Sequence, residues 1–264
     1  MRKVVTRFAP SPTGYLHIGG VRTALFNYIF AKKHAGEFLL RVEDTDQERS
    51  KGEYTDAIIE GLRWLGLTYD GNPTHQSERS VLYQNETARL LANGKAYRCS
   101  CSPERLDALR KEQESKGLKP MYDGLCRDKG ITDEDTVVRL KTPTEGSTIV
   151  DDAVYGKIEF LNKELDDLII QRSNKTPTYH LCNVVDDNAQ GVTHIIRGED
   201  HLPNTPRQIQ IIKALGYDGF NYAHLPLVLG EDKKRLSKRH AATDLMAYKK
   251  LGYLADAILN MLAR

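Results

Sequence analysis

Residues 7–20 read RFAPSPTGYLHIGG, and this segment connects an expected strand to an expected helix. The β-branched run at residues 3–9 suits a buried strand, and the prolines and glycine at 10–14 break it. Apolar residues then recur at helical spacing over residues 19–35. Another apolar run at 38–42 predicts the next strand. A strand, a crossover helix and a second strand in this order predict a doubly wound parallel sheet.

The turn before the helix carries the first candidate chemistry. Free N–H groups at a helix start attract anions, and the glycine pair Gly19-Gly20 lets a nucleotide approach the backbone closely. His17 precedes this pair and lies where its ring reaches a phosphate. The alternative is a corner whose histidine and glycines only shape the turn.

The rest of the chain indicates an α/β fold with an inserted unit. We expect a helix at residues 54–65, and a charged helix at 103–114 inside an insertion that also holds strands at 136–141 and 154–160. Strand patterns resume after the insertion at 168–172, 193–196 and 225–229. A helix is expected between the last two of these strands, at 205–215. No internal repeat or low-complexity tract interrupts this order.

The last residues predict an amphipathic helix at 254–264. Its apolar face is formed by Leu254, Ile258, Leu259 and Leu262. No Gly, Asn or Pro follows it as a stop signal, so we expect the chain to be part of a longer protein.

Composition is that of an ordinary soluble enzyme. The chain has 264 residues, 40% hydrophobic and 28% charged, with a formal net charge of +2. Any contact with a polyanion must therefore come from local clusters. The N-terminus lacks a signal-peptide pattern and no apolar run reaches membrane-spanning length, so we expect a cytoplasmic monomer with no membrane contact.

A second basic segment, KKRLSKRH at residues 233–240, follows an expected strand. A run of basic residues is usually a solvated loop. At this place in a nucleotide-binding fold, its cations can instead stabilise developing phosphate charge.

Together the two segments resemble the HIGH and KMSKS signatures of class I aminoacyl-tRNA synthetases, and residues 7–14 resemble the glutamyl branch. Gly20 stands where the signature has its second His, and Arg235 and Arg239 replace the first Lys and the last Ser. Lys238 matches the second Lys, which in the family neutralises ATP phosphate charge as pyrophosphate leaves. The pair, in the right order, is far more specific than either segment alone.

Polar residues at expected strand ends predict an amino-acid pocket. Arg7 and Glu43 lie at the ends of expected strands and Arg197 follows one, and in a doubly wound sheet such ends line one crevice. Arginines and acids at strand ends also often pair only with one another. Glutamate, with two carboxylates and an ammonium, needs arginine forks and an acid.

Three further runs, at 41–46, 178–187 and 197–201, resemble segments of glutamyl enzymes. The resemblance implies that glutamate is contacted by Arg7, Ser11, Glu43, Tyr179, Asn183 and Arg197. Glu43 would hold the ammonium and the arginines the carboxylates. It also implies catalytic roles for His17 and Lys238, and ATP contacts from His17, Gly19, Gly20, Asp200, Arg235, Leu236 and Lys238.

The resemblance implies a bacterial glutamyl-tRNA synthetase catalytic part without its C-terminal anticodon-binding domain. Its Rossmann-like domain would occupy 1–98 and 166–239, an acceptor-stem-binding α/β subdomain 99–165, and the start of a helical stem-contact region 240–264. It would ligate L-glutamate to tRNA(Glu) with Mg·ATP, through a glutamyl-adenylate and only with tRNA bound.

Two alternatives stay open. The short paralogue that makes glutamyl-queuosine on tRNA(Asp) fits the length, but it usually has Gln after the signature Lys, where this chain has Arg239-His240. The other alternative is a catalytically silent tRNA- or nucleotide-binding fragment.

Cysteine spacing predicts a zinc site within the insertion. Cys99, Cys101 and Cys126 follow a C-x-C…C pattern, and zinc takes four thiolate, imidazole or oxygen ligands. Three reduced cysteines in a small core are the alternative. Related enzymes take the fourth ligand two residues after the third Cys or from a Tyr four before it. Here Asp128 is the first choice and Tyr122 the alternative. Cys182 lies in an apolar helix and is expected in the core.

Overall fold

The computed structural model describes residues 2–46, 48–229 and 244–264. Its first elements follow the expected order: strand β1 (Val5–Phe8), helix α1 (Ile18–Lys33) and strand β2 (Glu37–Val42). β1 and β2 pair in parallel. Gly36 makes the turn between α1 and β2, because a Cβ there would lie 2.2 Å from the carbonyl oxygen of Val4.

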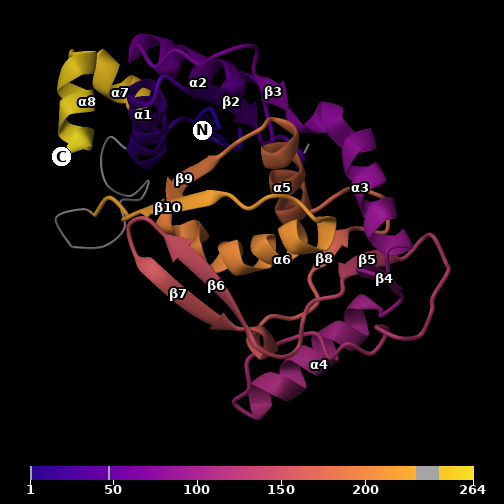
Figure 1. Cartoon of the computed structure of the whole chain (residues 1–264). Helices are drawn as coiled ribbons and strands as arrows, with labels where there is room; N and C mark the ends of the chain where they lie inside the picture. The colour runs from indigo at the N-terminus through magenta and orange to yellow at the C-terminus, as the bar shows by residue number, and fades with distance from the viewer. Residues whose placement is uncertain (1, 47, 230–243) are drawn as a thin grey trace.

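A parallel sheet and a mixed sheet meet edge to edge, and Figure 1 shows most of their strands. The parallel sheet has the order β1-β2-β3, with β3 at Thr74–His75. The mixed sheet has the order β7-β6-β10-β9, with β6 at Ser147–Asp152, β7 at Gly156–Leu161 and β10 at Asn221–Leu225, and only β7 in it is antiparallel. β9 (His194–Gly198) lies beside β1, and Thr193 N donates to Val5 O at 2.9 Å. The following strands are therefore added outward from β1 on one side and outward from β9 on the other. The boundary between β1 and β9 is a topological switch point.

Helices cover this sheet and close two main hydrophobic cores. The first core packs α1 against the following α2 (Gly52–Trp64), the short α7 (Leu245–Lys250) and α8 (Ala255–Ala263). The second core is built around α3 (Ser80–Ala92), α5 (Tyr179–Ala189) and α6 (Thr205–Leu215). Cys182 is fully buried in the second core, which confirms its expected place. Short 3₁₀ turns link the elements at Gln76–Arg79, Asn162–Glu164 and Glu199–Asn204.

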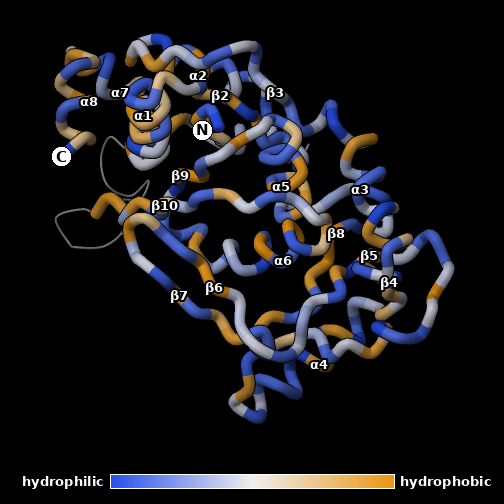
Figure 2. Tube along the Cα trace, in the orientation of Figure 1, coloured by the Kyte–Doolittle hydropathy of each residue, from blue (hydrophilic) through white to orange (hydrophobic). Residues whose placement is uncertain are grey.

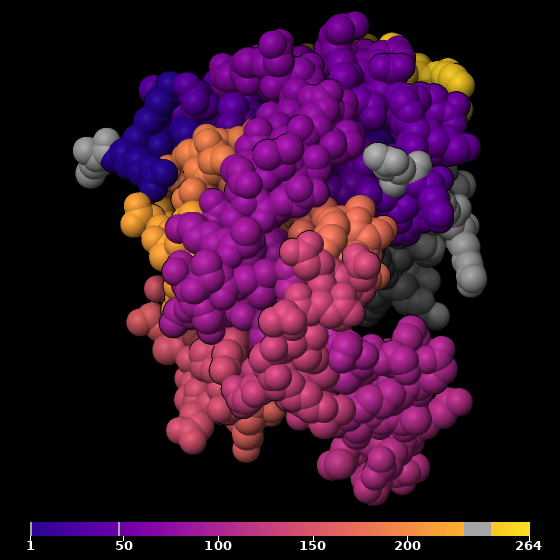
Figure 3. Space-filling view, turned by 90° about the vertical axis from the view of Figure 1, so that its right-hand side faces the viewer, coloured from indigo at the N-terminus to yellow at the C-terminus, as the bar shows by residue number. Residues whose placement is uncertain are grey.

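The inserted unit projects as a lobe at the lower end of the molecule (Figure 3). It holds the charged helix α4 (Pro103–Ser115), along which hydrophilic residues predominate in Figure 2. An antiparallel sheet, β4-β5-β8, joins it to the body through β4 (Ala96–Cys99), β5 (Val137–Leu140) and β8 (Ile169–Gln171). The α/β class with a parallel sheet and an inserted unit is thus confirmed.

The partners of two strands differ from expectation. β8 does not resume the central sheet but pairs antiparallel with β5, because its buried Ile170 joins Val138 and Leu140 in one core. The strand expected at 154–160 forms at β7 (Gly156–Leu161), in a hairpin with β6 (Ser147–Asp152). That hairpin extends the central sheet, since β6 pairs in parallel with β10. The proposed boundaries at 98/99 and 165/166 stay predictions, although the sheet β4-β5-β8 crosses both.

Two placements near the end were wrong. β10 spans Asn221–Leu225, not 225–229, and Pro226 ends it because proline has no N–H for the ladder. On the last helix, Ile258 and Leu262 are buried, but Leu254 is 74% exposed because it lies at the N-cap. Within the described residues, no helix has the length and apolar character that a membrane crossing needs.

Candidate active site

A cavity of about 910 Å³ opens at the switch point, between the carboxyl ends of β1 and β9 and the start of α1. It is lined by every described residue predicted to contact glutamate or ATP: Arg7, Ser11, His17, Gly19, Gly20, Glu43, Tyr179, Asn183, Arg197 and Asp200. Arg235, Leu236 and Lys238 lie outside the described residues. The volume suits a ligand the size of an aminoacyl nucleotide.

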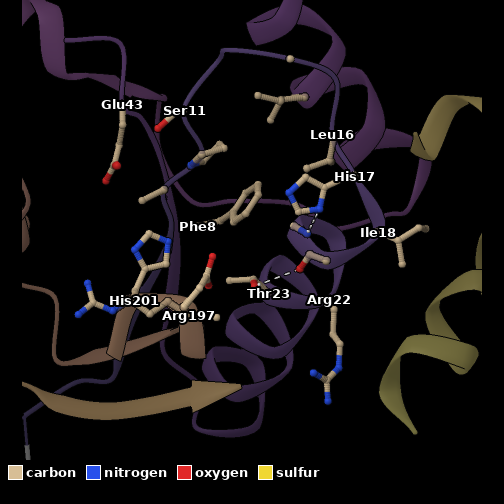
Figure 4. A pocket seen from close by; sticks show the side chains of 18 of the residues that line it. Phe8, Ser11, Leu16, His17, Ile18, Arg22, Thr23, Glu43, Arg197 and His201 are labelled. Atoms are coloured by element: carbon tan, nitrogen blue, oxygen red, sulfur yellow. Dashed lines mark hydrogen bonds between the residues drawn. The ribbon is translucent and has the colours of Figure 1, made fainter. Parts of the chain in front are cut away.

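One end of the cavity is the N-terminus of α1. His17 is its N-cap, and its Nδ1 accepts a hydrogen bond from Gly20 N at 3.1 Å, which leaves the ring proton on Nε2 (Figure 4). Cβ atoms on Gly19 and Gly20 would press on the His17 ring at 3.1 Å and on Leu16 at 3.0 Å. The Gly20 departure from the signature therefore suits the packing of this helix start, which offers N–H donors to an anion.

The other end holds an acid and three polar side chains. Glu43 and Ser11 lie there in Figure 4, across the cavity from His17. Burial raises the pKa of Glu43, although the charges of nearby arginines act in the opposite direction. Asn183 and Tyr179 come from the first turns of α5. Burial raises the pKa of Tyr179 to about 12, so this side chain remains a phenol at neutral pH.

Arg7 is already neutralised inside the protein. Its Nε and Nη2 donate to the two carboxylate oxygens of Asp187 at 2.9 and 3.3 Å. Burial opposes ionisation of Asp187, but the charges of Arg41 and Arg7 and their hydrogen bonds hold its pKa below the usual range. This pair fixes the Arg7 guanidinium at the edge of the cavity.

Arg41 is the residue that sequence reasoning missed. It is fully buried beneath the cavity and donates to Asp187 at 2.6 Å and to Asn183 Oδ1 at 3.1 Å. Its Nη2 also lies 3.6 Å from a Glu43 oxygen. Arg41 thus orients three groups of the site at once. A charged residue inside the apolar strand β2 was the available signal, together with the consecutive acids Asp186 and Asp187 on α5.

Arg197 is the contrasting arginine. Only 5% of its surface is exposed, and burial lowers its pKa. Its hydrogen bonds within the described part of the chain go to neutral groups, His224 Nε2 at 3.1 Å and Thr205 Oγ1 at 2.8 Å, and no carboxylate pairs with it there. Burying a cation without a counter-ion carries a large desolvation penalty, and a bound anion would offset that penalty. Arg197 and His201 border the cavity near Glu43 (Figure 4).

The chain passes the cavity again on both sides of the 230–243 segment. Leu227 and Val228 line it on one side and Asp244 on the other. Leu245 N donates to Leu16 O at 2.9 Å, next to His17. The predicted phosphate-binding residues therefore belong to a segment whose described flanks both reach the α1 end of the cavity.

A separate cluster lies in the inserted lobe. The sulfur atoms of Cys99, Cys101 and Cys126 lie within 4.8 Å of one another. The Tyr122 hydroxyl oxygen is 3.3 Å from the Cys99 sulfur and 3.6 Å from the Cys101 sulfur. These four side chains offer one oxygen and three sulfur donors around a common point.

This donor set fits zinc. Zn–S bonds of about 2.3 Å place tetrahedral thiolates about 3.8 Å apart, close to the 3.5 Å between Cys101 and Cys126. Burial opposes ionisation of Cys126, but hydrogen bonds from Tyr122 and its neighbours lower its pKa to about 7. Asp128, the first choice for fourth ligand, is 80% exposed and pairs with Lys141 at 2.8 Å. The geometry favours Tyr122.

The switch-point cavity, the helix N-terminus and the arginine–acid lining are typical of a ligand site in a doubly wound nucleotide-binding domain. A family model described as tRNA synthetases class I (E and Q), catalytic domain, matches residues 3–264, and the chain belongs to this family.

Similar proteins with established names include several glutamate–tRNA ligases. The chain is 54% identical to glutamate–tRNA ligase 1 of Alkalilimnicola ehrlichii and 55% identical to glutamate–tRNA ligase of Geobacter sulfurreducens, each time over 100% of the chain and 57% of the relative. A crystal structure of a glutamate tRNA ligase from Elizabethkingia meningosepticum in complex with its amino acid superposes with a TM-score of 0.89 at 35% identity, covering 99% of the chain and 60% of that protein. The chain thus spans little more than half the length of these relatives.

Proposed function

We propose that this chain carries the catalytic centre for ATP-dependent ligation of L-glutamate to tRNA(Glu). The observation that carries the proposal is the buried guanidinium of Arg197, which has no carboxylate partner among the described residues, in a cavity that also presents Glu43 and the N-terminus of α1. The names of the relatives point to the same reaction.

In the first step, a glutamate α-carboxylate oxygen attacks the α-phosphorus of ATP. A new P–O bond forms, the bond to the β-phosphate oxygen breaks, and pyrophosphate leaves. Glu43 holds the substrate ammonium, and Ser11, Tyr179 and Asn183 complete the polar lining. Catalysis rests on positioning and charge stabilisation, without a covalent nucleophile.

Arg197, rather than Arg7, would bind the glutamate side-chain carboxylate. Arg7 is already paired with Asp187, whereas Arg197 has no carboxylate partner in the described part of the chain and would gain one from the substrate. Glutamine would leave this cation buried without a partner, a large penalty.

ATP would lie against the α1 N-terminus. In this arrangement the His17 ring and the Gly19 N–H would face its phosphates. Asp200 and Gly20, whose N–H donates to His17 Nδ1, also line the cavity. Mg²⁺ would screen the phosphate charge, and Lys238 would take up charge as pyrophosphate departs.

In the second step, the terminal adenosine hydroxyl of tRNA attacks the glutamyl carbonyl carbon, and AMP leaves. The inserted lobe would contact the acceptor stem, with zinc held by Cys99, Cys101, Cys126 and Tyr122. Cytoplasmic location, a monomeric state and the tRNA requirement of the first step stay predictions.

The test is thermal melting of this chain with a non-hydrolysable glutamyl-adenylate analogue, with its glutaminyl counterpart, and with neither. At about a hundred times its Kd, a ligand adds about 2.7 kcal/mol. For a chain of this size that is a rise of about 5 °C or more. A rise with the glutamyl analogue alone supports the proposal. Equal rises contradict glutamate selectivity, and no rise contradicts an assembled site.

A further inference from the structure

The inference concerns what holds Arg197 in place. A guanidinium can only donate hydrogen bonds, so the His224 Nε2 atom that receives Arg197 Nε at 3.1 Å must be an acceptor. The His224 ring is completely buried, and burial lowers its pKa. It is therefore a neutral imidazole with its proton on Nδ1.

That Nδ1 proton has a defined acceptor. Asp152 Oδ2 lies 2.6 Å from His224 Nδ1. The same carboxylate accepts backbone N–H groups from Val154 at 2.9 Å, Tyr155 at 3.0 Å and His224 itself at 3.1 Å. Burial opposes ionisation of Asp152, but these donors hold its pKa below the usual range. Asp152 is thus a fixed carboxylate at the end of β6.

The arrangement places a negative charge one imidazole ring away from Arg197. A carboxylate in direct contact would occupy the guanidinium fork, as Asp187 does for Arg7. Here His224 Nε2 accepts the hydrogen bond from Arg197 Nε–H, and Thr205 Oγ1 accepts one from Nη2–H. Within the described residues the remaining donors of Arg197 have no carboxylate partner, and they border the cavity.

We propose that His224 and Asp152 are positioning residues for glutamate recognition. They fix the orientation of Arg197 and supply a remote counter-charge, while its cavity-facing edge stays available for the substrate side-chain carboxylate. The inference rests on the proposed function and deepens it, because it assigns selectivity to a buried Asp–His–Arg chain that reaches the cavity from the β6–β7 hairpin.

The test compares dissociation constants of the glutamyl- and glutaminyl-adenylate analogues by calorimetry. His224→Leu removes the acceptor and is expected to weaken the glutamyl analogue by about tenfold to a hundredfold, with little change for the glutaminyl analogue. Asp152→Asn presents an NH₂ group to the ring, which favours the other tautomer, and is expected to lower the same preference.

Two variants separate positioning from simple packing. His224→Gln restores both an acceptor toward Arg197 and a donor toward Asp152, and is expected to recover most of the glutamyl preference. Tyr222→Phe is the matched control, because its ring stacks on His224 with 6.3 Å between ring centroids, while its buried hydroxyl has no hydrogen-bond partner among the residues that the structure describes. A Leu variant that melts like the unmodified chain and keeps its preference would overturn the proposal, as would equal losses in the Leu and Gln variants.

A measurement on the unmodified chain keeps the proposal testable if the Leu variant does not fold. Long-range ¹H–¹⁵N correlation of the histidine rings, assigned by the loss of signals in His224→Gln, should give His224 a protonated Nδ1. A protonated Nε2 would overturn the proposal. If the unmodified chain binds neither analogue, the proposed function fails instead, and the tautomer still reports on the chain of contacts.

Discussion

At the residue scale, the site contains two buried arginines with opposite electrostatic surroundings. Arg41 lies among Asp186, Asp187 and Glu43. Arg197 has neutral partners alone among the described residues. Removing one partner of a buried ion pair strands a charge, whereas removing a charge that has no partner relieves a desolvation cost.

This contrast predicts opposite effects of the same substitution. Arg41→Met is expected to lower the free energy of unfolding by about 3–5 kcal/mol. Arg197→Met is expected to leave it unchanged or raise it, yet to abolish binding of the glutamyl-adenylate analogue. Urea denaturation and calorimetry measure both quantities. Equal destabilisation by the two variants would contradict the assignment of Arg197 as the cation without a counter-ion.

Glu43 gives a pH-dependent prediction at the same scale. Burial raises the pKa of Glu43 above its ordinary value, so its contribution to stability is greatest at low pH and falls as pH rises through the folded-state pKa. Glu43→Gln removes this penalty. The melting temperature of the variant relative to the unmodified chain should therefore be higher at pH 7 than at pH 4. A melting-temperature difference that does not change with pH would show that the nearby arginines fully offset the effect of burial on Glu43.

At the scale of elements, local patterns located most helices and strands but not their partners. α6 occupies the expected 205–215, and α1, β2 and α4 begin and end within about two residues of expectation, as is usual for element boundaries. β8 was also found, but its pairing with β5 was not. Hydrophobic periodicity reports which face of an element is buried, and that face is the same against either neighbour.

The α1–β2 turn gives a prediction about an element junction. Gly36→Ala places a methyl group against the backbone of Val4, and backbone cannot move aside as a side chain does. We expect a loss of about 2–4 kcal/mol in the free energy of unfolding. Gly52→Ala is the control, since a Cβ at Gly52 meets nothing within 4 Å at the start of α2. It should be neutral or stabilise by up to about 1 kcal/mol, and a similar loss in both variants would contradict the steric explanation.

At the scale of the whole molecule, the inserted lobe contributes a candidate zinc site, and its cysteines do not line the switch-point cavity. We expect the purified chain to hold one zinc ion, and a strong chelator to lower its melting temperature. Cys101→Ser and Tyr122→Phe should reduce zinc content, whereas Asp128→Asn, which only loses the exposed pair with Lys141, should not. Metal analysis by mass spectrometry measures this. Loss of zinc only in the Asp128→Asn variant would show that Asp128, and not Tyr122, is the fourth ligand.

The amino-acid sequence was enough to predict the fold class, the family resemblance and ten of the residues that line the cavity. These follow from local signals: strand–turn–helix chemistry in residues 7–20, acids and arginines at strand ends, and cysteine spacing. The packing of the folded chain was needed to show that Arg7 pairs with Asp187 while Arg197 has no carboxylate partner among the described residues, that Tyr122 and not Asp128 lies beside the thiols, and that His224 and Asp152 lie behind Arg197. Most of these pairings join residues dozens of positions or more apart, and packing of separate elements, not any periodic pattern, brings such residues together.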